Sequence, residues 1–412
     1  MNLTITPARL RGALTPPPSK SQAHRLILCA ALADGVSTIG NIALSQDIKA
    51  TLSCMSALGA GIEFPDARTL RLRGIGGSLP RRPEALPRFD CGESGSTLRF
   101  LIPVALAAAG GGSFTGRGRL MERPQKPYFD LFTEKGIPFR QEDGILTVNG
   151  TLSSGEYRLE GNVSSQFFTG LLYALPLLEG DSKIISTTEL ESVGYINMTR
   201  RAMEEFGVVT GHEGLAFHVP GGQRFQPRDT AVEADWSKAA FWYAAQTVGN
   251  DVTVTGMNED SLQLDRMVAR YSDMIRKDGA VSLDVRHCPD LVPPLAAMGA
   301  LMDGTLYLKN AGRLRIKESD RLATVTAALN AMGASVTEET DSLIIEGKPS
   351  LPGGATVNCC NDHRIAMMAA IAATGCQQPV TLLGAQCVAK SYPDFWEDYR
   401  MLGGLIHEHT GE

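Results

Sequence analysis

One pattern recurs along this chain and limits what it can fold into: a helical stretch, a glycine, a short strand, a polar turn and often a second strand. In each copy the glycine stands where a helix must end in the left-handed conformation before a strand begins. Five clear copies are marked by Gly59, Gly136, Gly207, Gly279 and Gly333. The strands that follow, such as residues 144–150, alternate polar and apolar side chains as half-buried strands do. The sequence therefore predicts a mixed α/β fold.

The spacing of the glycines indicates the size of the repeated unit. They lie roughly 50–80 residues apart, which is too far for a solenoid and suits a βαβαββ module. A sixth, degenerate copy is expected around residues 380–402. Six modules divide as three plus three, which agrees with the two domains that a length of 412 residues suggests. A seam is expected at residues 221–229, before a new strand at 230–234. Two doubly wound domains are the alternative, but paired strands after each helix fit it poorly.

Composition and charge exclude several classes of protein. With 43% hydrophobic and 20% charged residues, the chain is globular. A formal charge of −6 argues against a general nucleic-acid binder, although a local basic cleft remains possible. The longest apolar runs, residues 101–109 and 365–373, are shorter than the roughly 20 residues that a bilayer helix requires. Because the first residues also lack the features of a secretory signal, we expect a cytoplasmic protein without a membrane span.

The cysteines and histidines give no clear metal site. The eight cysteines form no Cys-x-x-Cys pair, and the adjacent Cys359 and Cys360 are poorly placed to share one zinc ion. We expect reduced, mostly buried thiols. His407 and His409 have chelating spacing, but a solvated tail is the expected structure there. The motifs of nucleotide hydrolases, dinucleotide-binding domains, zinc proteases and serine hydrolases are absent. The sequence thus predicts chemistry without a metal or cofactor.

Four expected helices open with a polar cluster: residues 16–25, 92–99, 163–166 and 361–364. Two of these clusters place cations, Lys20 with Arg25 and Arg364, close to the helix start. Helix N-termini carry partial positive charge, so cations there are unfavourable unless an anion is bound. Each cluster alone is also explained by a capped surface helix, for which Ser19 is a good N-cap. Together they predict a site for compounds with several phosphate or carboxylate groups.

Three further segments add charged residues. The loops 116–124 and 389–394 carry basic side chains, although a solvated turn is the commoner explanation of such charges. Lys317 and Arg321 are expected one helical turn apart, with Glu318 three residues before Arg321. An exposed helix with ion pairs is the simple explanation. A carboxylate among cations, such as Glu318, is also suited to be one member of an acid–base pair. Asp290 is a candidate for the other member, but spacing alone does not establish that pairing.

The ordered motifs resemble one family, the 5-enolpyruvylshikimate-3-phosphate synthases. The resemblance covers essentially the whole chain and rests on Pro-Ser-Lys-Ser at 18–21, Glu-Ser-Gly-Ser-Thr-Leu-Arg at 93–99, Arg-Leu-Met-Glu-Arg-Pro at 119–124, Val-Ser-Ser-Gln at 163–166, Ile-Lys-Glu-Ser-Asp-Arg at 316–321, Asn-Asp-His-Arg at 361–364 and Ala-Lys-Ser-Tyr-Pro-Asp at 389–394. It implies an inside-out α/β barrel fold of two similar domains, each of three βαβαββ units. The implied domains are residues 20–231 and residues 1–19 plus 232–412, with the active site in the cleft between them.

The resemblance also implies a reaction and a set of residues. The family transfers the enolpyruvyl group of phosphoenolpyruvate to the 5-hydroxyl of shikimate 3-phosphate and needs no metal. The residues implied to bind shikimate 3-phosphate are Lys20, Ser21, Arg25, Ser164, Ser165, Gln166, Ser192, Asp290 and Lys317. Those implied to bind phosphoenolpyruvate are Lys20, Gly95, Arg119, Gln166, Arg321, Arg364 and Lys390. Asp290 would accept a proton, Glu318 would donate one, and Lys20 would bridge the two ligands. We expect a monomer that acts on these small molecules, with neither nucleic acid nor membrane as partner.

Two positions depart from the family pattern, and two other functions stay open. Glu93 stands where many members have asparagine, and Arg313 where some have an asparagine that contacts the shikimate phosphate. The main alternative is the related enolpyruvyl transferase that acts on UDP-N-acetylglucosamine, although no equivalent of its cysteine-bearing loop is seen. The other is a non-catalytic anion-binding protein on the same fold, which would not need Asp290 and Glu318 beside the cations.

Overall fold

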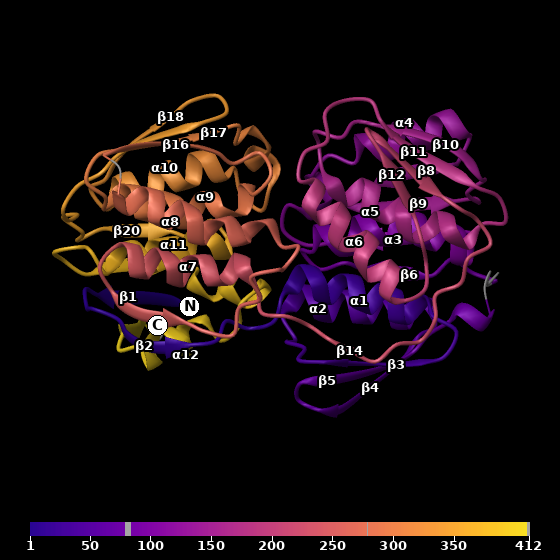
Figure 1. The fold of residues 1–412 in the computed structure, drawn as a ribbon, viewed down its shortest axis with the longest axis horizontal. Helices are drawn as coiled ribbons and strands as arrows, with labels where there is room; N and C mark the ends of the chain where they lie inside the picture. The colour runs from indigo at the N-terminus through magenta and orange to yellow at the C-terminus, as the bar shows by residue number, and fades with distance from the viewer. Residues whose placement is uncertain (79–83, 278, 410–412) are drawn as a thin grey trace. The chain divides into compact units, whose positions relative to one another are not determined.

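The chain divides into two compact units. In the computed structural model, which describes residues 1–78, 84–277 and 279–409, one unit is Pro18–Glu233 and the other joins Met1–Pro17 to Ala234–Glu412. Figure 1 shows both chain ends in the second unit, where the first strand lies between strands from the end of the chain. The described residues of each unit form three sheets.

The unit 18–233 repeats one sheet three times. In each four-stranded sheet the first two strands are parallel and the other neighbours are antiparallel. The first sheet consists of β14 (Thr230–Ala231), β3 (Val36–Gly40), β5 (Thr69–Arg73) and β4 (Gly61–Asp66). The second consists of β6 (Arg88–Asp90), β7 (Gly111–Thr115), β9 (Ile145–Asn149) and β8 (Phe139–Glu142). The third consists of β10 (Gly155–Leu159), β11 (Ser182–Ser186), β13 (Ala216–Val219) and β12 (Gly211–Glu213).

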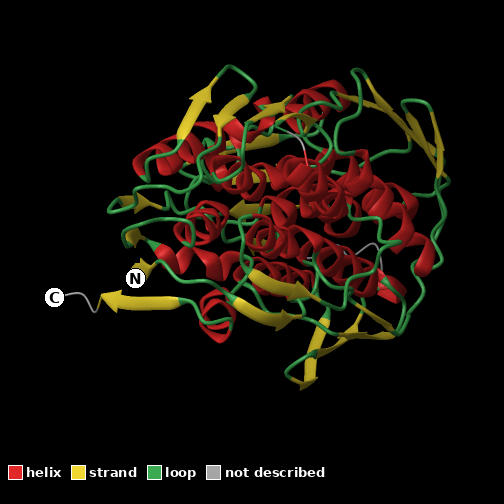
Figure 2. Cartoon of the chain, turned by 60° about the vertical axis from the view of Figure 1, so that its left-hand side comes forward, coloured by secondary structure: helices red, strands yellow, loops and turns green. Residues whose placement is uncertain are grey.

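Two kinds of helix accompany these sheets. The helices that precede the second strand of each sheet are α1 (Lys20–Leu32), α3 (Gly95–Ala109) and α5 (Ser165–Ala174). They are buried along almost their whole length because alanine, leucine and phenylalanine occupy nearly every face. The other three, each leading to a hairpin, are α2 (Gln46–Leu58), α4 (Lys126–Lys135) and α6 (Val193–Glu205). These bury one face only. Figure 2 shows the resulting arrangement, with strands outside the helices.

The second unit follows the same plan with one reduced copy. Its complete sheets are β16 (Ala280–Asp284), β17 (Thr305–Lys309), β19 (Leu343–Glu346) and β18 (Ser335–Glu338), and β20 (Thr356–Asn358), β21 (Val380–Leu383), β1 (Asn2–Thr6) and β22 (Leu405–His409). The third sheet contains β15 (Asp251–Val254) and β2 (Arg11–Leu14). The helices are α7 (Trp236–Thr247), α8 (Met267–Lys277), α9 (Val292–Ala300), α10 (Arg321–Ala331), α11 (His363–Ala373) and α12 (Phe395–Met401).

The α/β fold of repeated βαβαββ units is confirmed, but the place of the degenerate copy was wrong. The C-terminal module is complete because β1, from the other end of the chain, supplies its fourth strand. The reduced copy is the one with β2 and β15. The expected left-handed glycines after helices are found at Gly59, Gly136, Gly207 and Gly333, while Gly279 follows residue 278, which lies outside the described residues.

The C-terminal histidines are exposed, as expected, but they lie in a strand rather than in an irregular tail. His407 and His409 belong to β22, and His409 Nε2 lies 2.7 Å from Thr4 Oγ1 on β1. Backbone pairing with β1 explains the difference, because the partner strand is almost the full chain length away in sequence. All eight cysteines are free, and seven of them are buried while Cys360 is exposed, as predicted. No helix in the described part of the chain is both long and apolar enough to cross a membrane.

Candidate active site

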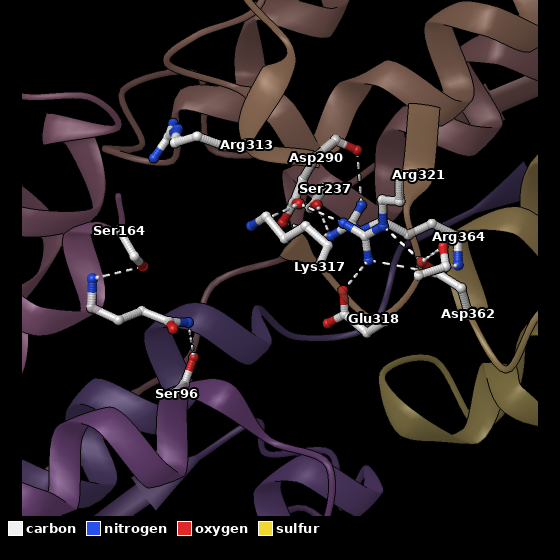
Figure 3. A network of polar contacts seen from close by, with 12 residues as sticks. Ser96, Ser164, Ser237, Asp290, Arg313, Lys317, Glu318, Arg321, Asp362 and Arg364 are labelled. Carbon is white, nitrogen blue, oxygen red and sulfur yellow. Dashed lines mark hydrogen bonds and ion pairs between the residues drawn. The ribbon is translucent and has the colours of Figure 1, made fainter. Parts of the chain in front are cut away.

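Three carboxylates converge on the guanidinium group of Arg321 in the unit 234–409. Arg321 Nη1 donates to Asp290 Oδ1 at 2.9 Å and Nη2 donates to Glu318 Oε2 at 2.5 Å. Its Nε donates to Asp362 Oδ2 at 2.8 Å. Only 1% of the Arg321 side chain is exposed, so these hydrogen bonds satisfy a buried charge (Figure 3). Asp290 and Glu318, which the sequence suggested as a pair, thus meet on one arginine.

Asp290 is surrounded by cations. Arg364 Nη2 donates to its Oδ2 at 3.0 Å, and Lys317 Nζ lies 3.7 Å from its Oδ1. Burial alone would raise the pKa of the Asp290 carboxyl, but the charges of Arg364, Lys317 and Arg321 outweigh burial and hold that pKa well below its usual range. Asp290 is therefore ionised in the ligand-free protein.

The segment 313–321 is not the single helix that the spacing suggested. A 3-10 helix, η6 (Gly312–Ile316), ends before Lys317, and α10 begins only at Arg321. Asp320 starts α10 as its N-cap, with its side chain accepting from the Ala323 N–H at 3.3 Å. Lys317 and Glu318 consequently lie in the turn between two helices, and Arg321 comes from the first turn of α10. The cap explains the break, because an N-cap residue has non-helical backbone angles.

The start of α11 supplies Asp362 and Arg364, and Lys390 from the 3-10 helix η7 (Ala385–Lys390) contacts Asn361 just before this start. Asp362 caps the helix by accepting from the Arg364 N–H at 3.0 Å while its other oxygen holds Arg321. Arg364 Nη2 also donates to Ser237 Oγ at 2.7 Å. Lys390, which is buried, donates to the Asn361 carbonyl at 2.6 Å. Asn361 has a φ of 53°, a left-handed conformation that is uncommon for a residue with a side chain.

Arg313, one of the two positions that depart from the family pattern, lies in η6. Its Nη2 donates to the Arg286 carbonyl at 2.6 Å. This bond fixes one end of the guanidinium to the protein, and the group is half-buried. Figure 3 shows the side chain at the edge of the ionic cluster of the same unit.

In the unit 18–233, Lys20 opens α1 and is paired with an acid that the sequence analysis missed. Lys20 Nζ lies 2.9 Å from Asp47 Oδ2, and the two side chains are 17% and 12% exposed. Asp47 lies in the first turn of α2, where a carboxylate is favoured by the helix dipole. An acidic residue in the first turn of a helix is common, so the sequence gave no indication that Asp47 contacts Lys20.

A second cluster joins the starts of α3 and α5. Gln166 Nε2 donates to Ser96 Oγ at 2.9 Å, and Arg99 Nη1 donates to Gln166 Oε1 at 2.8 Å. Ser164 is the N-cap of α5, and its hydroxyl accepts from the Gln166 N–H at 3.3 Å (Figure 3). Ser165 follows as the first helical residue and is buried. The polar clusters predicted at 92–99 and 163–166 are therefore in contact.

Arg25 and Ser192 are held by α6. Arg25 is buried and donates to Thr199 Oγ1 at 2.9 Å, to the Tyr195 carbonyl at 2.9 Å and to the Ser21 carbonyl at 2.6 Å. These bonds occupy part of its five N–H donors and fix the plane of the guanidinium. Ser192 precedes α6 with a φ of 54°, which is uncommon for a residue with a side chain.

Gly95 and Arg119 lie in different surroundings. Gly95 is the first residue of α3, and a Cβ there would lie 3.1 Å from Arg123 Nη1 and 3.4 Å from Gln166 Oε1. A side chain would thus crowd two polar groups. Arg119 is exposed, and its Nε lies 4.0 Å from Glu122 Oε2. The carboxylate of Glu93 lies against the loop of Arg119, since a Cβ on Gly118 would meet Glu93 Oε2 at 2.6 Å.

Comparison with known proteins decides the family. The family model described as EPSP synthase (3-phosphoshikimate 1-carboxyvinyltransferase) matches residues 5–399. The chain belongs to the EPSP synthase family. A curated 3-phosphoshikimate 1-carboxyvinyltransferase from Clostridium kluyveri is 45% identical over 98% of each chain. One of the same name from Clostridioides difficile is 42% identical over 99% of this chain and 98% of its own.

Solved structures show the same fold. An EPSP synthase from Acinetobacter baumannii matches with a TM-score of 0.81 at 24% identity, covering 99% of this chain and all of that one. The enolpyruvyl transferase NikO from Streptomyces tendae matches with a TM-score of 0.78 at 17% identity, covering 100% of this chain and 99% of that one. Like the curated EPSP synthases, this chain is a transferase, and the expected family is confirmed. The alternative with a UDP-sugar acceptor is not favoured.

Proposed function

We propose that this protein transfers the enolpyruvyl group of phosphoenolpyruvate to the 5-hydroxyl of shikimate 3-phosphate and releases phosphate. The observation that carries the proposal is the cluster on Arg321, where two carboxylates suited to acid–base chemistry are held among cations suited to an anionic substrate. The full-length similarity to 3-phosphoshikimate 1-carboxyvinyltransferases supports it.

The binding of each substrate is proposed residue by residue. Shikimate 3-phosphate is assigned to hydroxyl and amide donors at helix starts, to cations and to one carboxylate. These residues are Lys20, Ser21, Arg25, Ser164, Ser165, Gln166, Ser192, Asp290 and Lys317. Phosphoenolpyruvate is assigned to Lys20, Gly95, Arg119, Gln166, Arg321, Arg364 and Lys390. Helix N-termini and arginine guanidinium groups both favour phosphate and carboxylate oxygens.

The proposed chemistry is addition followed by elimination. The oxygen of the 5-hydroxyl attacks C2 of phosphoenolpyruvate while Asp290 accepts the proton of that hydroxyl. Glu318 gives a proton to the methylene carbon C3. The tetrahedral intermediate then loses phosphate from C2 and returns a proton from C3 to Glu318, which restores the carbon–carbon double bond. The proton held by Asp290 leaves with the phosphate. The anionic ligand would bind Arg321 and Arg364, and the negative charge of the ligand would offset the positive charge of the two arginines. Because those arginines hold the pKa of Asp290 low, ligand binding would raise the proton affinity of Asp290.

A phosphate-release assay tests this function. Purified protein should release inorganic phosphate only when shikimate 3-phosphate and phosphoenolpyruvate are both present, and a chelator should leave the rate unchanged. Turnover with UDP-N-acetylglucosamine in place of shikimate 3-phosphate would assign the protein to the related transferase. Binding of both ligands without turnover would favour a non-catalytic anion-binding protein.

Three coarser expectations accompany the proposal. The proposed partners are the two small molecules, without nucleic acid or a membrane surface, which is consistent with the formal charge of −6. A monomer in the cytoplasm is proposed as the working form. Size-exclusion chromatography with light scattering would test the oligomeric state, and fractionation of the source cells would test the location.

A further inference from the structure

The first turn of α7 places a hydroxyl group against Arg364, one of the two arginines beside Asp290. Ser237 Oγ accepts a hydrogen bond from Arg364 Nη2 at 2.7 Å (Figure 3). Ser237 is half-buried, whereas Trp236 and Lys238 on either side of it in the sequence are buried. Its side chain therefore lies on the face of the turn that borders the ionic cluster, and the proposed mechanism assigns no role to it.

The turn that carries Ser237 is held in place by its own hydrogen bonds. Gln263 Oε1 accepts from the Trp236 N–H at 3.0 Å, and Gln263 Nε2 donates to the Ala234 carbonyl at 2.9 Å. These two bonds fix the backbone at the start of α7 without involving Arg364. Ser237 is thus a hydroxyl on a fixed element, which is what the precise positioning of a neighbouring side chain requires.

The five N–H groups of Arg364 are divided between protein acceptors and a ligand. Nη2 carries two of them and donates to two acceptors, Ser237 Oγ and, at 3.0 Å, Asp290 Oδ2. Nη1 donates to the Asp290 carbonyl at 3.0 Å. Within the described part of the chain, no acceptor takes the second N–H of Nη1 or the N–H of Nε. Those two groups remain for an anionic ligand, and Ser237 helps to set how the guanidinium plane is turned toward it.

The hydroxyl of Ser237 is uncharged, and this decides what it does to Arg364. Arg364 already forms an ion pair with Asp290, and a further carboxylate would offset the charge with which the arginine attracts an anion. A hydroxyl group fixes the guanidinium by a hydrogen bond and leaves its positive charge in place. Only 8% of the Arg364 side chain is exposed, so solvent screens that charge weakly.

We propose that Ser237 is a positioning residue for phosphoenolpyruvate: it holds Arg364 in the orientation that binds this substrate while leaving the charge of the arginine available. The inference rests on the proposed function, because it needs Arg364 to bind phosphoenolpyruvate. Asp290, the other acceptor for Arg364, belongs to η5 (Pro289–Leu291). Ser237 therefore adds a second fixed point from a different element of the fold.

Three substitutions of Ser237 separate the hydrogen bond from the charge. Ser237→Ala removes the acceptor and should raise the KM for phosphoenolpyruvate roughly tenfold to a hundredfold, the effect expected when a hydrogen bond to a charged group is lost. Ser237→Thr keeps the hydroxyl and should keep a KM near the wild-type value. Ser237→Asp keeps an acceptor but adds a negative charge, so it should raise this KM more than Ser237→Ala does. The KM for shikimate 3-phosphate, which is not assigned to Arg364, should change little in all three variants.

A matched control removes a hydroxyl from the other end of the same helix. Thr247 Oγ1 donates to the Tyr243 carbonyl at 2.9 Å, and Thr247→Ala should leave both KM values unchanged. Thermal unfolding of each variant shows whether the fold is retained, and Ser237→Asp should retain it because a carboxylate is favoured in the first turn of a helix.

Several results would overturn the positioning role of Ser237. A lower KM for phosphoenolpyruvate in Ser237→Ala would show that the serine competes with the substrate for Arg364. An unchanged KM, or an equal rise in both KM values, would show that the bond does not orient Arg364 for this substrate. A Ser237→Thr variant that unfolds at the wild-type temperature but has the KM of Ser237→Ala would also contradict the proposal. Absence of phosphate release by the wild type would instead refute the proposed function.

Discussion

Lys20 and Asp47 form an ion pair across the starts of two helices, with Lys20 Nζ 2.9 Å from Asp47 Oδ2. The pair is mostly buried, so its geometry is less screened by solvent than that of surface pairs. Because Lys20 is proposed to contact both substrates, Asp47 would set where its ammonium group points.

Replacing Asp47 is expected to weaken substrate binding at the proposed site, although Asp47 is not itself proposed to contact a substrate. Asp47→Asn should raise the KM for both substrates and lower kcat, by roughly tenfold in kcat/KM, because Lys20 loses the partner that orients it. Steady-state kinetics measures the change. The control is Asp130→Asn, which removes an exposed ion pair with Lys126 in the same unit and should have no effect. Lower KM values in Asp47→Asn would show that Asp47 competes with substrates for Lys20.

The two carboxylates on Arg321 are expected to act in proton transfer. Asp290→Asn and Glu318→Gln should each lower kcat by roughly 10²–10⁴, the usual range for loss of a general acid or base. Both substrates should still bind in calorimetric titrations. Asp303→Asn, an exposed carboxylate in a turn of the same unit, serves as the control. Near-normal turnover in either variant would remove that residue from the mechanism.

Glu93 is expected to organise its loop rather than contact phosphoenolpyruvate. Its carboxylate lies against Gly118, and the proposed partner cations are Arg99 and Arg123. Glu93→Gln should then raise the KM for phosphoenolpyruvate, because the loop that carries Arg119 loses a support. If Glu93 only repels the anionic substrate, the same change should lower that KM with kcat unchanged.

Asp265 is a buried carboxylate, and its charge predicts how the stability of the protein depends on pH. Its folded-state pKa of about 6 lies above the usual 3.8 of an aspartate, so the ionised form opposes folding at high pH. Asp265→Asn should therefore stabilise the protein at pH 8 by up to about 3 kcal/mol, from about two pKa units at ~1.4 kcal/mol each. The gain in stability of the variant should decrease as the pH falls from 6 to 4, and it should be absent below pH 4. Urea unfolding at pH 8 and pH 4 measures it, and a loss of stability at pH 8 would contradict the raised pKa.

The same linkage applies to Asp290 in the other direction. Its depressed pKa means that the ionised form stabilises the folded state above the ordinary aspartate range, and that this stability is lost as pH falls through and below that range. Asp290→Asn should therefore lose stability at pH 8 and be less sensitive to acid than the wild type. Equal acid sensitivity of the two proteins would show that the cations around Asp290 do not stabilise its charge.

The sequence by itself determined the repeated module and the helix starts. Ser19, Ser164 and Asp362 cap helices as their local patterns predict, because a cap depends on a side chain and backbone N–H groups two or three residues away. Glycines such as Gly59 and Gly333 end helices for an equally local reason. The resemblance of the motifs then identified the family, because motifs and their order can be read from the sequence without knowing which residues are in contact.

Only the tertiary structure decided which charges meet. Arg321 gathers Asp290, Glu318 and Asp362 from three separate segments, and Asp47 reaches Lys20 from another helix. The completion of the last sheet by β1 was likewise invisible locally. These contacts join residues far apart in the chain, and their energies depend on burial, which lowers the local dielectric and makes an unpaired charge costly. Spacing along the sequence carries no information about that burial. The ionic cluster could therefore be recognised only in the tertiary structure.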